Sequence, residues 1–315
     1  MTQPAHENEK RPSRLRRWLR WAVAAMGVCA VLVVAALVGV PLYLEGPTVR
    51  GSGSGTLQAA ELNQPGPRPA ELTVMTLNLA HGRAEKSHQA LLRKATIAKH
   101  LDAVADVLRE VSPHVVALQE ADGPSLWSGR FDHVARVAEK AGFEHSFRGE
   151  HVRGMKLSYG TALLSEYDLE NTASITFPPS PPTWTKGVVV GEVQVPGIGL
   201  VTVASVHLDF AQQSARKQQA ERLVAELKDR SRPLIVLGDF NCDWDDESTL
   251  PDVAEGLGLH AYAPEEETVT FPKLGKRLDW ILVSDELEFV DCDVLSEPIS
   301  DHRAVTATLR LAERP

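Results

Sequence analysis

The sequence predicts a mixed α/β domain over residues 71–315, preceded by a membrane anchor and a linker. Short β-rich segments alternate with segments of helical periodicity early in this domain, and a hairpin lies in its middle. The domain is also long enough to cover both faces of a sheet. The hydrophobic fraction of 43% and the charged fraction of 24% are those of an ordinary globular protein.

The clearest helical pattern covers residues 94–111. Ile97, Leu101 and Val104 are spaced three or four apart, so that they share one face of a helix. Pro113 ends this helix, because the residue before a proline is kept out of the helical conformation. Two further helices are predicted over residues 131–141, with Gly142 as the C-terminal cap, and over residues 212–230.

The predicted strands are short and rich in β-branched residues, which fit a pleated surface. Pro196 and Gly197 form the turn that joins two of them as a hairpin. The predicted strands cover residues 72–79, 115–118, 161–165, 187–195, 200–206, 233–237, 278–283 and 304–311.

The first 50 residues differ from the rest. Basic residues within 1–20 precede an uncharged apolar run over residues 21–44, which exceeds the roughly 20 residues that a transmembrane helix needs. The positive-inside rule keeps residues 1–20 in the cytoplasm and places the α/β domain outside it. A buried core helix and a cleaved signal peptide are the alternatives. Apolar character on all faces argues against the first, and the length of the run argues against the second.

Residues 45–70 are predicted to be a linker, Gly/Ser-rich at first and Pro-rich later. The whole chain has a net charge of −9, and because the N-terminal segment is basic, the domain itself is more acidic. Such a domain is poorly suited to sequence-independent binding of duplex nucleic acid, although a bound divalent cation would invert the local field. Cys242 and Cys292 would both lie in an oxidising environment, where a disulfide between them is possible.

Six short polar motifs follow or interrupt apolar runs in the predicted domain. A buried acidic or amide group is costly unless something pairs with it, so the six motifs suggest that strand ends converge on one polar, metal-binding, hydrolytic site. The motifs are Thr76-Leu77-Asn78, Leu118-Gln119-Glu120, Val206-His207-Leu208-Asp209, Gly238-Asp239-Phe240-Asn241, Arg277-Leu278-Asp279-Trp280 and Ser300-Asp301-His302.

The residue types in these motifs suit the hydrolysis of a phosphoester. An aspartate such as Asp239 can hold a metal or orient a water, and an amide such as Asn241 can donate to a phosphate oxygen. A histidine beside a carboxylate, such as His302, can serve as acid or base, and Asp279 could fix its tautomer. Taken singly, each of these residues could equally be structural, so that the prediction depends on their joint pattern.

In their order along the chain, the six motifs resemble the endonuclease/exonuclease/phosphatase superfamily. This superfamily has the metal-dependent phosphodiesterase fold of pancreatic-type deoxyribonuclease, neutral sphingomyelinases and inositol-polyphosphate 5-phosphatases. The resemblance covers residues 72–312. It implies a four-layer α/β/β/α sandwich in which helices flank two central mixed sheets, with the active site at one edge.

The resemblance also implies a divalent cation, Mg²⁺ or Mn²⁺, for which hard oxygen ligands are suited. Asn78 and Glu120 would hold it, with Asp301 contributing nearby. Many relatives have an asparagine that binds phosphate where this chain has Thr161, which makes the substrate class harder to assign.

The other motif residues receive catalytic roles from the same resemblance. His302, oriented by Asp279, would act on the attacking water or bind the phosphate. Asp239 would position or deprotonate the nucleophile. His207 and Asn241 would steady the phosphoryl oxygens as charge develops in the transition state.

Three interpretations of the function remain open from the sequence. The membrane anchor and the acidic domain favour an extracytoplasmic phosphodiesterase or phosphomonoesterase that acts on a lipid headgroup or a small phosphoester. An extracytoplasmic nuclease is favoured by cations near the predicted site segments. An inactive module that binds metal or phosphate is disfavoured, because no site position is visibly replaced. No obligate protein partner is predicted. The cations that favour the nuclease interpretation are Lys156, Lys186, Lys273, Lys276, Arg277 and Arg303.

Overall fold

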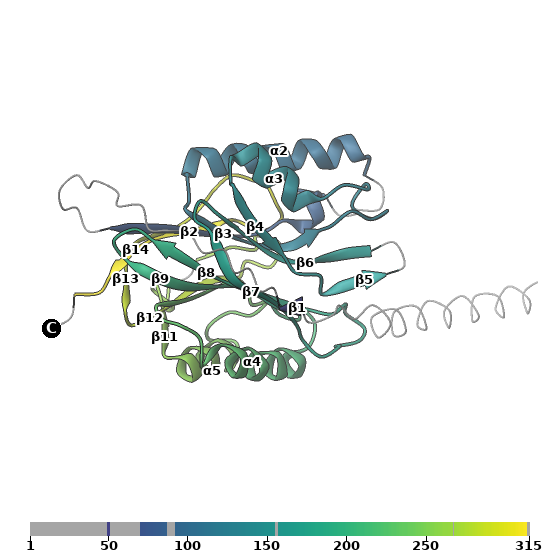
Figure 1. The fold of residues 1–315 in the computed structure, drawn as a ribbon. Helices are drawn as coiled ribbons and strands as arrows, with labels where there is room; N and C mark the ends of the chain where they lie inside the picture. Colours follow the sequence, from purple (N-terminus) through teal and green to yellow (C-terminus); the bar gives the residue numbers. More distant parts are fainter. Residues whose placement is uncertain (1–48, 51–69, 87–91, 155–156, 267, 314–315) are drawn as a thin grey trace, which may run out of the picture.

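The computed structural model describes residues 49–50, 70–86, 92–154, 157–266 and 268–313 (Figure 1). The predicted cytoplasmic segment and transmembrane helix, residues 1–44, lie outside the described residues, as does most of the predicted linker. Among the helices that are described, none combines the length and the apolar character that a membrane span requires.

The described residues form two mixed β-sheets with helices on their outer faces (Figure 1). The helical elements are the 3₁₀ turn η1 (Ala80–Gly82), α2 (Lys94–Val111), α3 (His133–Ala141), α4 (Gln213–Leu227) and α5 (Thr249–Leu257). The strands are β1 (Val49–Arg50), β2 (Glu71–Asn78), β3 (Val115–Asp122), β4 (His145–Arg148), β5 (Val152–Gly154), β6 (Leu157–Ser165), β7 (Leu169–Thr176), β8 (Gly187–Val195), β9 (Gly199–His207), β10 (Leu234–Asp239), β11 (Leu259–Ala261), β12 (Asp279–Ser284), β13 (Leu287–Val294) and β14 (Val305–Leu311).

One sheet has the strand order β1-β7-β8-β9-β10-β12-β11, and the other has the order β13-β14-β2-β3-β6-β4, with β5 also paired to β6. Each sheet contains one parallel pair, β9 with β10 in the first and β2 with β3 in the second. The remaining pairs in both sheets are antiparallel. Both sheets are therefore mixed, as the resemblance implies.

The layers are held together by three apolar clusters. Trp280 and Phe240 belong to the cluster between the first sheet and helices α4 and α5. Ile235 lies in the cluster that joins the two sheets, and Leu101 lies in the cluster that joins the second sheet to α2 and α3. Figure 1 shows α2 and α3 on one side of the paired sheets and α4 and α5 on the other. The order of layers is thus α/β/β/α, which confirms the predicted sandwich.

Most elements agree with their predictions. Helix α2 has the predicted bounds, Gly142 ends α3 in the left-handed conformation, and β8 and β9 form the predicted hairpin. The elements not predicted from the sequence lack a long apolar run. Strands β7 and β13 are partly exposed and carry several polar residues, and helix α5 contains a proline and a glycine, both of which are poor helix formers.

Candidate active site

Three of the predicted site residues lie side by side at the ends of neighbouring strands in the first sheet. Asp239, the last residue of β10, is paired with His207 of β9 and with Asp279 of β12. Gly238 allows this close approach, because a Cβ atom at its position would lie 2.0 Å from the carbonyl oxygen of Val206. Strand register therefore brings the side chains together.

The second sheet contributes Asn78, at the end of β2, and Glu120, in β3. Strand β3 continues past its predicted end at Leu118, and its pairing with β6 shifts between Leu118 and Ala121. Glu120 lies in this irregularity with a left-handed φ of 47°. A bulge of this kind redirects a side chain, and non-glycine residues in this conformation cluster at functional sites.

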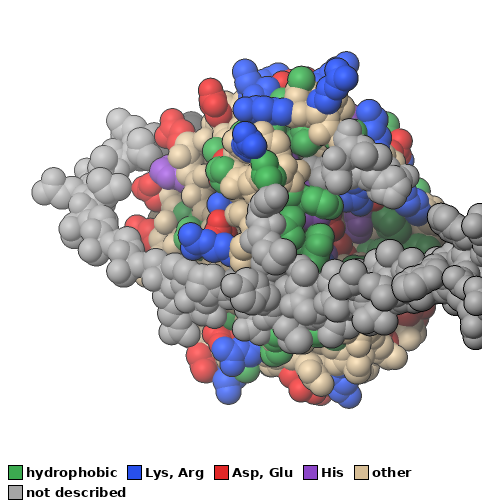
Figure 2. All heavy atoms as spheres, turned by 90° about the vertical axis from the view of Figure 1, so that its right-hand side faces the viewer, with side chains coloured by type: hydrophobic (Ala, Val, Ile, Leu, Met, Phe, Trp, Pro, Cys, Tyr) green, Lys and Arg blue, Asp and Glu red, His purple; other side chains and the backbone are tan. Residues whose placement is uncertain are grey.

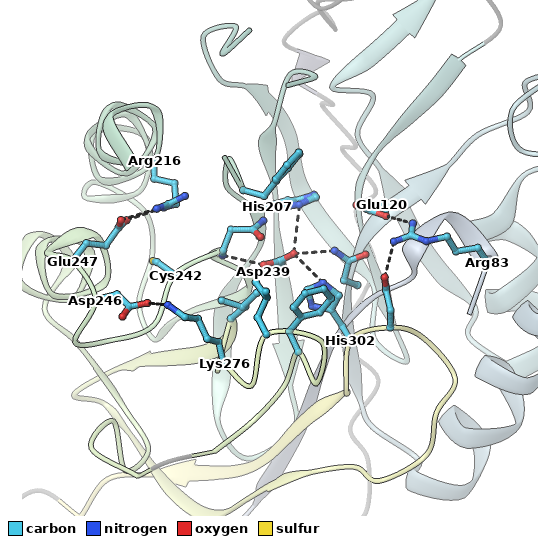
Figure 3. A pocket seen from close by; sticks show the side chains of 17 residues that line it. Arg83, Glu120, His207, Arg216, Asp239, Cys242, Asp246, Glu247, Lys276 and His302 are labelled. Atoms are coloured by element: carbon cyan, nitrogen blue, oxygen red, sulfur yellow. Dashed lines mark hydrogen bonds and ion pairs between the residues drawn. The ribbon is translucent and has the colours of Figure 1, made fainter. Parts of the chain in front are cut away.

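Asn78, Glu120, His207 and Asp239 line a cavity of about 440 Å³ (Figure 3). On the corresponding face of the molecule, acidic, basic and histidine side chains lie together in a recess beside hydrophobic side chains (Figure 2). The cavity is lined by Asn78, Arg83, Glu120, His207, Phe210, Arg216, Asp239, Asn241, Cys242, Asp246, Glu247, Phe271, Leu274, Lys276, Leu278, Asp301 and His302.

Asp239 is the central polar group of the cavity. Its Oδ2 atom accepts a hydrogen bond of 2.9 Å from Asn78 and lies 3.5 Å from Nε2 of His207 and 3.8 Å from Nε2 of His302 (Figure 3). Its Oδ1 atom accepts from the backbone N–H of Asn241. Burial raises the pKa of Asp239 to about 7, although the charge of His302 acts in the opposite direction. A carboxylate with a pKa near neutrality is suited to act as a general base.

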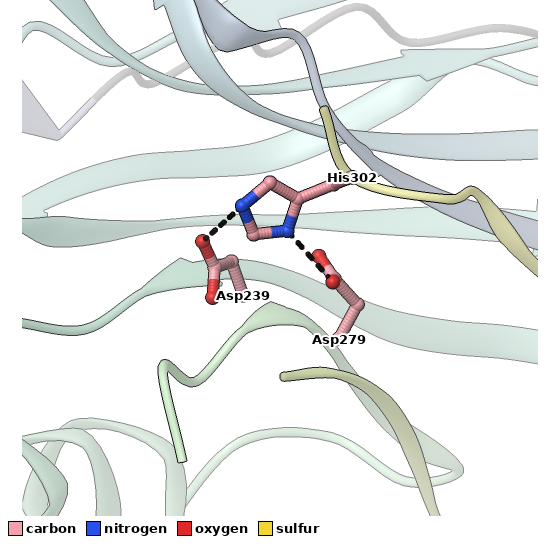
Figure 4. A group of neighbouring side chains, drawn as sticks. All are labelled: Asp239, Asp279 and His302. Carbon is pink, nitrogen blue, oxygen red and sulfur yellow. Dashed lines mark hydrogen bonds and ion pairs between the residues drawn. The ribbon is translucent and has the colours of Figure 1, made fainter. Parts of the chain in front are cut away.

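His302 is held between two carboxylates (Figure 4). Its Nδ1 atom lies 2.8 Å from Oδ2 of Asp279, which also accepts a hydrogen bond from Thr270. Burial lowers the pKa of His302, but Asp279 and Asp239 outweigh this effect and raise it to about 10. The imidazole is therefore protonated at neutral pH, and Asp279 has the orienting position that the sequence predicts.

Lys186 is a site residue that the sequence identified only as one of several nearby cations. It directly precedes β8, its side chain is buried, and its Nζ atom lies 3.3 Å from Nε2 of His207. Burial lowers the pKa of Lys186. Burial and the lysine charge together lower the pKa of His207 well below its usual value. The neutral His207 can therefore accept a hydrogen bond from Lys186.

We expect the substitution Lys186→Met to raise KM for a phosphoester by roughly 10- to 100-fold, because a buried ammonium interacts strongly with an anion. Steady-state kinetics would measure the change. Lys217→Met on the exposed face of α4 is the matched control, and it should leave KM unchanged. A KM in the Lys186 variant equal to that of the native chain would show that the ammonium does not contact substrate.

Glu120 and Asp301, the two carboxylates predicted to hold a cation, lie on either side of Arg83. Glu120 also lies 3.3 Å from Nε2 of His81, whose Nδ1 atom contacts Asp122 at 2.8 Å. Burial raises the pKa of Glu120, but the charges of His81 and Arg83 dominate and hold it far below its usual value. The roles of His81, Arg83 and Asp122 were missed, because nothing in their local sequence distinguishes them from loop and strand residues.

Two groups of side chains could hold a divalent cation. Asp239, Asp279 and His302 each offer a ligand atom within 4.8 Å of the others, but an imidazole nitrogen suits Mg²⁺ less well than a carboxylate oxygen does. Glu120 and Asp301 offer hard carboxylate oxygens, and Oδ1 of Asp301 is buried without a hydrogen-bond partner among the described residues. The second pair therefore fits Mg²⁺ or Mn²⁺ better.

The remaining predicted residues lie close to the cavity with specific partners. Asn78 accepts a hydrogen bond from the backbone of Ala80 through Oδ1, so that its amide nitrogen faces Asp239. Asn241 donates to the carbonyl of Leu208. Thr161 does not line the cavity: it is buried, and its hydroxyl lies 3.0 Å from Nε2 of His151.

Most of the other cations that could follow a nucleic-acid backbone already have partners within the protein. Lys276 contacts Asp246, and Arg303 lies 3.2 Å from Glu85. Arg277 stacks 3.9 Å over the ring of Trp280 and donates to backbone carbonyls. Lys156 lies outside the described residues. Cys242 and Cys292 are free thiols, so that the possible disulfide is absent between these two described residues.

Comparisons with known proteins are consistent with this geometry. The sequence profile of the Endonuclease/Exonuclease/phosphatase family matches residues 75–302. No curated protein sequence matches the chain.

Solved structures show the same fold at low sequence identity. An endonuclease/exonuclease/phosphatase from Beutenbergia cavernae is 22% identical, with a TM-score of 0.58, over 77% of this chain and 72% of that one. The human Nocturnin catalytic domain, solved with a bound sulfate anion, is 21% identical, with a TM-score of 0.59, over 77% and 95%. A mannosyl-6-phosphatase from Bacteroides thetaiotaomicron is 16% identical, with a TM-score of 0.55, over 76% and 99%.

Proposed function

Because the chain belongs to the endonuclease/exonuclease/phosphatase family, we propose that it is a divalent-cation-dependent phosphoester hydrolase. The observation that carries this proposal is the buried Asp239 carboxylate, which contacts Asn78, His207 and His302 at the wall of one cavity. This arrangement supports a site in which a base, a protonated imidazole and two carboxylates suited to a divalent cation act together.

The mechanism follows from the protonation states of these groups. Asp239 accepts a proton from the attacking water, for which a pKa near neutrality is suited. His302, protonated at neutral pH, stabilises negative charge on the phosphoryl oxygens, and Asp279 keeps it charged and oriented. Lys186 contributes a second positive charge beside His207. A divalent cation held by Glu120 and Asp301 supplies Lewis-acid polarisation of the phosphoryl group when bound.

A lipid headgroup or another small phosphoester is the substrate class that we propose. The cavity of about 440 Å³ is of a size that suits a small ligand. Lys276 and Arg303 form ion pairs with acidic neighbours. This weakens the argument for a basic groove that binds the backbone of a nucleic acid. The name of the mannosyl-6-phosphatase and the sulfate in the Nocturnin domain are in keeping with a site for a small anionic group.

We also propose that residues 21–44 anchor the chain in a membrane and that the catalytic domain lies outside the cytoplasm. The proposal is supported by the basic residues that precede this apolar run. Protease added to intact cells should digest the domain if this orientation is correct. Protection of the domain until the cells are lysed would contradict it.

We expect hydrolysis of bis(p-nitrophenyl) phosphate by the full-length protein to require Mg²⁺ or Mn²⁺ and to stop on addition of EDTA. The variant Glu120→Gln should lower kcat/KM by at least about 100-fold, since even partners of metal ligands contribute 10- to 100-fold. Full activity in the presence of EDTA would refute the cation dependence.

The same preparation should be assayed on sphingomyelin-type lipid, on a phosphomonoester and on plasmid DNA. Turnover of lipid or monoester without nicking of DNA would support the proposed substrate class. DNA nicking that requires Asp239 would establish the nuclease instead. Cation binding without turnover of any substrate would favour an inactive binding module.

A further inference from the structure

Arg83 bridges the two carboxylates to which the proposed function assigns the divalent cation. Its Nη1 atom donates to Oε2 of Glu120 at 3.2 Å, and its Nη2 atom donates to Oδ2 of Asp301 at 2.7 Å (Figure 3). Arg83 comes from the loop after η1, whereas its partners lie on β3 and in the loop before β14. The side chain of Arg83 is 20% exposed and that of Asp301 only 3%.

This bridge has the same electrostatic role as a bound cation. Two carboxylates that face one cavity repel each other, and Asp301, whose side chain is buried, also loses hydration, so a positive charge between them is strongly favoured. Lys273 adds a second positive group, 2.8 Å from the same oxygen of Asp301. A divalent ion that binds Glu120 and Asp301 must therefore compete with existing charge-assisted hydrogen bonds.

Arg83 has an alternative partner within the same cavity. It lines the cavity together with Asp239 and His302, where the phosphoryl group of a substrate would be attacked. A guanidinium matches two phosphoryl oxygens as well as it matches carboxylates. An arginine that leaves Glu120 and Asp301 can therefore bind the substrate without leaving the site.

We propose that Arg83 exchanges partners during the reaction cycle. In the cation-free protein it neutralises Glu120 and Asp301, and when a divalent cation binds, it is released to bind the phosphoryl group. This inference rests on the proposed function, because it takes Glu120 and Asp301 as the cation ligands. The proposal therefore gives Arg83 two opposite effects: its side chain weakens the binding of the cation and strengthens the binding of phosphate.

The test measures Mn²⁺ affinity by electron paramagnetic resonance and inorganic phosphate affinity by calorimetry, both in the full-length protein. We expect Arg83→Gln to tighten Mn²⁺ binding roughly tenfold, the equivalent of about 1.4 kcal/mol, and to weaken phosphate binding by the Mn²⁺-loaded protein by a similar factor. Arg83→Lys keeps the charge but cannot span both carboxylates, so its Mn²⁺ affinity should be intermediate. Circular dichroism would verify that both variants are folded.

Arg136→Gln is the matched control, because Arg136 also forms a two-pronged pair with a carboxylate, Asp102, but on helices α2 and α3. It should change neither affinity. Unchanged or weaker Mn²⁺ binding in folded Arg83→Gln would overturn the proposed exchange, provided that Glu120→Gln abolishes Mn²⁺ binding. If the native chain binds Mn²⁺ and Glu120→Gln binds it equally well, the assigned cation ligands are wrong and the exchange is overturned, whereas cation-dependent hydrolysis is decided by the EDTA assay.

Discussion

The variant Asp239→Asn should lose hydrolysis by about 10³-fold or more and yet unfold at a higher temperature than the native chain. An amide cannot accept the proton of the attacking water, and general-base groups contribute roughly 10² to 10⁴ in rate. The stability gain follows from burial, which raises the pKa of Asp239 to about 7 in the folded protein. An ionised carboxylate at this position is therefore less favourable in the folded than in the unfolded chain.

The pH dependence gives the sign of this effect. Below a pH of about 4, Asp239 is protonated in both the folded and the unfolded chain, and the substitution changes the stability little. The amount by which Asp239 destabilises the native fold grows as pH rises from about 4 to about 7 and stays at its full value above that. The gain in Tm should consequently be larger at pH 8 than at pH 4.5. A gain of about 1 kcal/mol would raise Tm by roughly 2–4 °C.

Calorimetric scans at the two pH values and steady-state kinetics would check this expectation. Asp291→Asn, at an exposed position on β13, is the matched control and should change neither Tm nor rate. A folded Asp239→Asn variant with native activity would remove Asp239 from the mechanism. A lower Tm at pH 8 would show that the contacts of the carboxylate with Asn78, His207 and His302 outweigh its burial.

Asp279→Asn should have the second large effect, through the charge state of His302. The carboxylate of Asp279 offsets the burial of the imidazole and, with Asp239, raises the pKa of His302 to about 10. Without this charge the pKa should fall toward or below the ordinary value of about 6.5. At pH 7.5 the imidazole would be charged in the native chain and largely neutral in the variant, and the rate should fall by roughly 10² to 10⁴.

The pKa can be measured directly by following the imidazole signals of His302 in an NMR titration of the cation-free protein. Asp168→Asn is the control, because Asp168 also lies beside a histidine, His145, but at the surface. It should leave the titration of His302 unchanged. A pKa for His302 that stays near 10 in Asp279→Asn would show that other groups hold the proton.

Local sequence patterns predicted the helices and strands that are defined by the apolar pattern of their own residues. The apolar face of residues 94–111 and the stop at Pro113 predict helix α2 with its observed bounds. Apolar runs that end in polar motifs predict the strands that carry Asn78, His207 and Asp239, because such strands are buried on both faces between layers. Strands β7 and β13 were missed, since a half-exposed strand does not need an apolar run.

The contrast is greatest within the site. By itself, the sequence determined which acidic, amide and histidine residues follow buried strands, and through their order it determined the family. Apart from Asp279 beside His302, it did not determine which of these residues are in contact. Only the tertiary structure placed Arg83 against Asp301, 218 residues away, and Lys186 against His207.

The physical reason is the range of the forces involved. Burial of an apolar segment is set largely by its own residues, so it leaves a pattern in the local sequence. Ion pairs and pKa shifts depend on register, on the packing of one sheet upon another and on distances of a few ångströms between segments far apart in the chain. The register of β10 with β9 and β12 decided that Asp239 lies between His207 and Asp279, and the packing of the second sheet on the first brought Asn78 to the same carboxylate.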